Sequence, residues 1–196
     1  MRQRVFTALC STLLLMFAAA TEATIITYTA ALSGLNEAPA NASPGTGFAV
    51  VTLDDVLNTM RVQVSFADLL GTTTASHIHC CTTIPLTGTA GVATTTPTFA
   101  GFPLGVTSGS YDNTLDMTLA SSYNPAFVTA HGGTTVGARA FLFSGMALNE
   151  SYLNIHTSLF GGGEIRGFLT AVPEPATLAL MGVGLALLSY RRHRVA

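Results

Sequence analysis

The chain has 196 residues, of which 9 % are charged, and its length suits one domain once two apolar ends are set aside. Residues 24–171 carry three arginines, no lysine and eight carboxylates, a net charge of −5. This balance excludes the basic surface that nucleic acid or an anionic membrane would require. The surface must be largely threonine, serine, glycine and alanine, a composition that is common in secreted β-proteins.

The first 23 residues have the pattern of a secretory signal peptide. Arg2 and Arg4 precede an apolar run at 5–20, and small residues stand where cleavage would occur, after Ala20 or Ala23. A membrane anchor is the alternative, but the apolar run is short for that role. We therefore expect residues 1–23 to be removed on export.

Three strands are predicted before residue 70, at 25–33, 47–54 and 60–68. The third has the clearest two-residue period in the chain, with an apolar face of Met60, Val62, Val64 and Phe66. The short connection between the second and third strands predicts a hairpin.

The segment 75–81, ASHIHCC, places two histidines and two cysteines on one predicted strand. Alternate residues of a strand share a face, so His77, His79 and Cys81 lie opposite Ile78 and Cys80. Cys80 and Cys81 are the two thiols that remain after export, and an oxidising compartment permits a disulfide between them. Free thiols or a bridge between two molecules remain open as alternatives.

The second half of the chain combines strands with helices. Residues 82–109 are rich in threonine, glycine and proline, and strands are predicted at 114–120, 151–158 and 161–170. A helix is expected to begin at Asn124-Pro125, and a helix is favoured over a strand at 136–150. Seven to nine short strands with one or two inserted helices predict a mainly-β sandwich or barrel.

A third histidine, like the first two, is expected on the strand face that points away from the core. Leu153 and Ile155 are expected to point inward, which leaves His156 on the opposite face. If the two strands are neighbours, His77, His79 and His156 converge into a zinc or copper site, with Cys81 or Glu164 as further ligands. Alternatively, the histidines hydrogen-bond one another and the backbone and hold the strands in register. A catalytic role is the third alternative.

Other polar residues are assigned structural roles. His131 stands before two glycines, where it would cap a helix end and favour the helix dipole. Glu164 and Arg166 lie two apart, and we expect a structural pair or contacts to neighbouring polar groups. The sequence has no Gly-x-Ser-x-Gly nucleophile motif and no phosphate-binding loop, so we assign no catalytic residue and do not expect an enzyme.

The C-terminal residues 172–196 have three parts. They are Pro173-Glu174-Pro175, an apolar run at 176–190, and the basic residues Arg191, Arg192 and Arg194. As a helix the apolar run would span about 22 Å, which is marginal against a hydrocarbon core of about 30 Å. The arginines would mark the cytoplasmic side.

The order of these parts resembles the PEP-CTERM sorting signal of bacteria. The resemblance implies an exosortase-type processing enzyme as partner and a transient stay in the inner membrane through the C-terminal transmembrane helix. The cell surface or extracellular matrix would follow. A plain tail anchor is the alternative.

Four motifs in order resemble the CHRD domain over essentially all of 25–170. They are YTAALSGLNEAP at 28–39, ASHIH at 75–79, YLNIHT at 152–157 and GEIRG at 163–167. The resemblance implies an immunoglobulin-like or sandwich fold and an extracellular structural or binding module. Cys80-Cys81-Thr82 stands where the family has a glycine-containing turn.

The combined expectation is an exported, non-catalytic matrix, biofilm or binding module, with exopolysaccharide or matrix proteins as partners. One alternative is a redox-type protein that binds zinc or copper through the three histidines. Another is a polysaccharide-binding module, although the chain lacks tryptophan. Its candidate sugar platforms would be Tyr28, Tyr111, Tyr123 and Tyr152.

Overall fold

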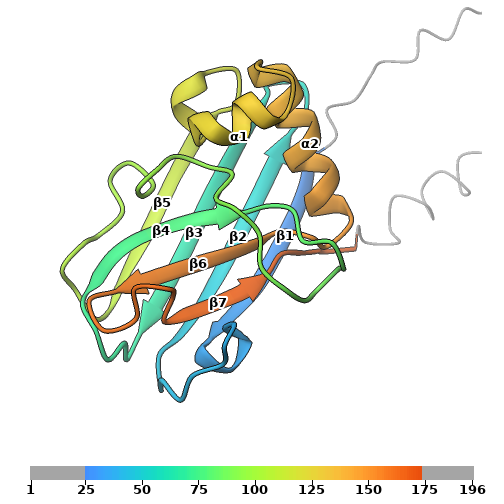
Figure 1. Cartoon of the computed structure of the whole chain (residues 1–196). Coiled ribbons are helices and arrows are strands. Elements are labelled where there is room, and N and C mark those ends of the chain that lie inside the picture. The colour runs from blue at the N-terminus through green and yellow to red at the C-terminus, as the bar shows by residue number, and fades with distance from the viewer. Residues whose placement is uncertain (1–24, 174–196) are drawn as a thin grey trace, which may run out of the picture.

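The computed structural model describes residues 25–173, which form one curled antiparallel sheet with two α-helices (Figure 1). The strands are β1 (Ile25–Ser33), β2 (Thr46–Asp54), β3 (Thr59–Ala67), β4 (Thr73–His79), β5 (Gly109–Asp116), β6 (Tyr152–Thr157), β7 (Ile165–Phe168) and β8 (Thr170–Ala171). The helices are α1 (Pro125–Ala130) and α2 (Thr135–Ala147), with short 3-10 turns η1 (Gly34–Asn36) and η2 (Ala120–Ser122). The predicted mainly-β fold with inserted helices is confirmed.

The sheet has the strand order β4-β6-β7-β1-β2-β3-β5, with β8 paired to β1. In Figure 1, β4, β6 and β7 cross over β1, β2 and β3, so the sheet curls back on itself. The core fills the space between the two halves, where Val51 and Val62 belong to the same buried cluster as Ile78, Leu153 and Ile155.

The predicted hairpin is formed by β2 and β3, paired from Thr46↔Ala67 to Asp54↔Thr59. Asp54 ends β2, and its side chain accepts hydrogen bonds from the backbone of Val56 (3.0 Å) and Leu57 (2.8 Å). These bonds satisfy the turn's amides and so favour chain reversal at this point.

Both predicted helices are present and begin at side-chain caps. Asn124 accepts a hydrogen bond from Ala126 at the start of α1, and Thr134 accepts one from Gly137 at the start of α2. The helices lie together at one end of the sheet (Figure 1).

The strand predicted at 114–120 is wrong in its position. β5 occupies Gly109–Asp116 and ends where the Asp116 carboxylate accepts hydrogen bonds from the backbone and hydroxyl of Thr118. This local bonding turns the chain away from the ladder, and η2 follows at Ala120. The predicted strand at 161–170 is also shorter in the structure, since β7 begins only at Ile165.

The predicted signal peptide at 1–23 lies outside the described residues. So does the tail from Glu174 onward, with the transmembrane helix that the sequence predicts there. Within residues 25–173, no helix is both long and apolar enough to cross a membrane.

Candidate metal centre

Neighbouring strands β4 and β6 bring His77, His79 and His156 together. The antiparallel register pairs His77 with Asn154 and Ala75 with His156, which puts all three imidazoles on the same face. One ring nitrogen from each histidine lies within 4.8 Å of the others. His77 and His79 are 6 % and 9 % exposed, and His156 is half-buried. The predicted convergence of the three side chains therefore occurs.

Each of these imidazoles is anchored by a backbone carbonyl from a loop. The Nδ1 atom of His77 lies 3.0 Å from the Pro97 oxygen, and that of His79 lies 2.8 Å from the Ala90 oxygen. The His156 Nδ1 atom lies 2.9 Å from the Gly161 oxygen. A carbonyl oxygen can only accept, so each Nδ1 must carry the proton. In the neutral ring, each Nε2 is then left with a lone pair.

Within residues 25–173, none of the three Nε2 atoms accepts a hydrogen bond from an ordinary donor. Those of His77 and His156 face each other at 2.9 Å. The Nε2 atom of His79 is buried without a hydrogen-bond partner among the described residues. An unpaired buried acceptor is costly, and two facing lone pairs repel unless a cation lies between them.

Protonation of the Nε2 atoms would remove the unpaired lone pairs, but at neutral pH it is unfavourable because burial disfavours the charged imidazolium. Burial, reinforced by the proximity of the other histidines, lowers the pKa of His77 and of His79 to about 4. Burial also lowers the pKa of His156. The cluster therefore presents three neutral imidazoles whose donor atoms converge.

Tyr152 separates the cluster from a buried arginine. Its ring stacks on His79 with a centroid distance of 4.6 Å and an angle of 8°. The guanidinium carbon of Arg166 lies 4.7 Å from the same ring. Since β6 lies between β4 and β7, the order across the sheet is His79, Tyr152, Arg166.

The structure does not bring Cys81 or Glu164 into the histidine cluster. Cys81 is joined to Cys80 by a disulfide just beyond the end of β4, and both sulfurs pack against Gly145 of α2. The buried Glu164 carboxylate instead accepts four hydrogen bonds. Its donors are the hydroxyls of Ser43 and Thr157 and the amides of Leu70 and Gly71.

Glu164 and Arg166 do not pair with each other; each contacts neighbouring polar groups instead, which is the second of the two expected arrangements. Arg166 donates from Nε to the Asn36 carbonyl and lies 3.7 Å from Glu37 Oε2. Sequence reasoning missed Glu37 because it comes from a loop far away in the chain.

His131 lies outside the cluster and ends α1, as expected, with its Nδ1 atom 2.7 Å from the Phe127 carbonyl oxygen. All four tyrosines named as sugar platforms are buried, with exposures of 7 % or less for Tyr28, Tyr111, Tyr123 and Tyr152. The expectation that they present ring faces to solvent is therefore wrong.

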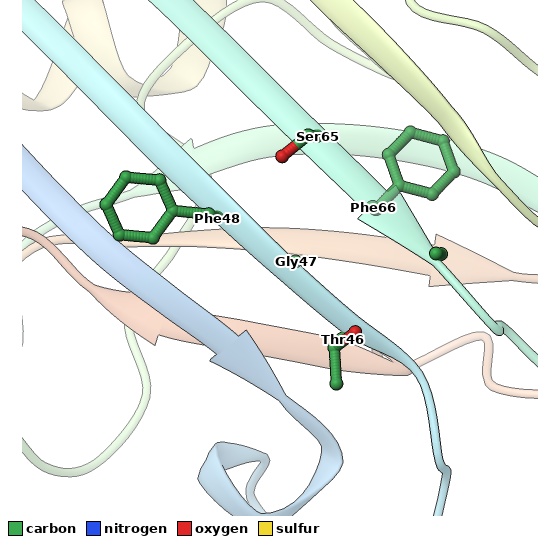
Figure 2. A pocket seen from close by; sticks show the side chains of 6 residues that line it. Thr46, Gly47, Phe48, Ser65 and Phe66 are labelled. Atoms are coloured by element: carbon green, nitrogen blue, oxygen red, sulfur yellow. The ribbon is translucent and has the colours of Figure 1, made fainter.

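An exposed aromatic ring instead lies at Phe48, beside a shallow hollow of about 340 Å³ on β2 and β3 (Figure 2). Its lining residues are Thr46, Gly47, Phe48, Ser65, Phe66 and Ala67, none of which is ionisable. This hollow therefore offers no acid–base or metal chemistry.

Two family models match this chain. The CHRD domain matches residues 28–169, and the PEP-CTERM protein-sorting motif matches residues 171–194. No curated protein and no solved structure matches. The sorting motif marks a secreted protein that is recognised and sorted by exosortase-type machinery. The domain match covers most of the chain, which therefore belongs to the CHRD-domain family.

Proposed function

We propose that this exported domain binds one zinc or copper ion through His77, His79 and His156. The observation that carries the proposal is the convergence of three Nε2 lone pairs whose rings are each anchored by a carbonyl at Nδ1. Metal-binding histidines are typically held in this way, because the second hydrogen bond fixes the tautomer and the ring orientation.

The donor set suits zinc or copper. Both metals accept neutral imidazole nitrogen, and three protein ligands leave a further position for water or another ligand. Zinc–nitrogen bonds of about 2.0–2.1 Å place tetrahedral ligand atoms about 3.3 Å apart. The 2.9 Å contact between His77 and His156 would open slightly, and His79 would move inward.

A purely structural role for the histidines requires a different proton arrangement. If His77 and His156 only held the strands in register, one Nε2 would have to carry a proton and donate to the other. The same ring would then be cationic, because its Nδ1 atom also needs a proton to bond its carbonyl. Burial lowers the pKa of His77 to about 4 and also lowers the pKa of His156, which disfavours a cationic ring at either position at neutral pH.

The proposed role in the cell is non-catalytic. A metal held on a rigid sheet would equip an exosortase-sorted protein to act as a binding or matrix module at the cell surface. Exopolysaccharide or matrix proteins are the partners that we expect there.

Thermal unfolding of the metal-stripped exported protein tests the proposal. Zinc or copper at one hundred times its dissociation constant should stabilise the native state by about 2.7 kcal/mol. His156→Gln should abolish this stabilisation, whereas His131→Gln, at a histidine outside the cluster, should retain it. The proposal would be overturned if the metal stabilised both variants equally, or if it did not stabilise the wild type.

A further inference from the structure

An open cleft of about 620 Å³ lies on the far side of Tyr152 from the histidine cluster. It is lined by β1, η1, the loop at 86–88, β7 and β8. Its polar lining residues are Asn36, Glu37, Thr87, Arg166 and Thr170. The volume falls within the range of small-molecule sites, which is about 300–1,000 Å³.

Arg166 is the fixed cation of this cleft. Its side chain is held by the Nε bond to the Asn36 carbonyl and by stacking on Tyr152 and Phe168, whose centroids lie 4.7 Å and 5.8 Å from the guanidinium carbon. The residue is 4 % exposed. No residue within 25–173 accepts a hydrogen bond from its Nη1 or Nη2 group. A buried, immobilised guanidinium with two free donor groups suits a carboxylate, which it can bind through two parallel hydrogen bonds.

Glu37 limits the charge that the cleft can accept. Its side chain is 4 % exposed, and its Oε1 atom has no hydrogen-bond partner among the described residues. Burial raises the pKa of Glu37 to about 7, against the opposing effect of the Arg166 charge. Near neutral pH, Glu37 and Arg166 together carry a charge between zero and +1, which suits a monoanion better than a dianion such as sulfate.

The remaining walls offer hydroxyls and apolar surface. Thr87 and Thr170 line the cleft, with the Thr170 hydroxyl donating to the Thr29 carbonyl (3.3 Å), while Leu86 and Phe168 contribute apolar side chains. A ligand that bears its own hydroxyl groups next to its carboxylate could use both kinds of surface.

From this juxtaposition we infer that the cleft binds a small hydroxylated monocarboxylate, such as a sugar acid. The carboxylate is held by the Nη groups of Arg166, and the ligand hydroxyls meet Thr87 and Thr170. The site is separate from the proposed metal centre and does not depend on it.

Calorimetric titration of the exported protein with D-glucuronate at pH 6, with a chelator present, tests this inference. The chelator removes any metal that could bind the carboxylate, so the outcome is independent of the metal proposal. D-Glucose is the neutral control, and inorganic sulfate, a dianion at pH 6, is the control for a higher charge. We expect glucuronate to bind at least tenfold more tightly than either.

Arg166→Lys keeps the charge but removes the fork of donors, and it should weaken glucuronate binding at least tenfold. Arg61→Lys, at an exposed arginine paired with Asp112 on β3 and β5, should leave binding unchanged. If Arg166→Lys does not fold, Thr87→Val provides the second variant and should weaken binding several-fold. Equal binding of glucuronate and glucose would overturn the inference. Undiminished binding by Arg166→Lys, or by Thr87→Val if Arg166→Lys does not fold, would also overturn it.

Discussion

The Nε2 atoms of His77 and His156 face each other at 2.9 Å, while the Nδ1 atom of each ring bonds a backbone carbonyl. Neither carbonyl can donate, so the pair has one proton too few for an ordinary histidine–histidine hydrogen bond. We predict that both rings are Nδ1–H tautomers in the metal-free protein at pH 7. Long-range proton–nitrogen NMR correlations would report the tautomers directly. A protonated Nε2 on either ring would instead support the register-holding role.

The packing of Gly145 against the disulfide leads to a second prediction. A Cβ atom at this position would collide with the sulfurs of Cys80 and Cys81. Gly145→Ala should therefore destabilise the protein by about 1–3 kcal/mol, despite the usual gain of about 1 kcal/mol from alanine in a helix.

The control for Gly145→Ala is the same substitution in a Cys80→Ala/Cys81→Ala background. There the sulfurs are gone, and alanine at 145 should be neutral or stabilising. Denaturant unfolding of the four proteins gives the coupling energy. Equal effects of Gly145→Ala in both backgrounds would show that the sulfurs do not limit the space.

Glu37 gives a pH-dependent prediction. Its pKa of about 7 in the folded protein lies above the ordinary value of 4.5, mainly because of burial. The stability that it contributes is therefore present below pH 4.5 and is lost as the pH rises through 7. Glu37→Gln lacks this loss, so its stability relative to wild type should rise by about 3 kcal/mol between pH 4 and pH 8. Unfolding at several pH values would measure it, and a flat difference would contradict the assignment.

Glu164 should behave in the opposite way. Burial alone would raise its pKa, but the hydrogen bonds from Ser43, Thr157, Leu70 and Gly71 outweigh that effect and lower it. Its contribution is therefore present above the ordinary pKa of 4.5 and is lost as the pH falls through the lower folded value.

Glu164→Gln should cost about 3 kcal/mol at pH 7, because the new amide group faces donors that need an acceptor. The cost should shrink in acid, where the wild type also loses its charge. Glu150→Gln makes the same chemical change at a half-buried carboxylate and should cost less than about 0.5 kcal/mol. Similar costs at both positions would contradict the role given to Glu164.

The sequence predicts a strand well where apolar and polar residues alternate strictly. Met60 to Phe66 alternate without a break, and the same parity argument places His77, His79 and His156 opposite the core. The face on which a side chain lies depends only on its position within its own strand, so it can be read directly from the sequence.

Which strands pair with each other depends on residues far apart in the chain, and the sequence does not predict these pairings. Arg166 lies near Glu37 because β7 pairs with β1, two strands that are separated by most of the domain's sequence. No residue spacing in the sequence predicts this pairing. The threonine- and glycine-rich segment before β5 has no period, so the start of that strand at Gly109 could not be seen. Its end at Asp116 depends on a side-chain bond that competes with the ladder.

The metal content of the exported protein is the most direct test of the central claim. The untagged wild type and the His77→Ala/His79→Ala double variant would be produced side by side in medium that contains zinc and copper. Elemental mass spectrometry would then measure metal per chain. The account predicts close to one zinc or copper ion per wild-type chain and none in the variant. No metal in the wild type, or the same metal content in both proteins, would contradict it.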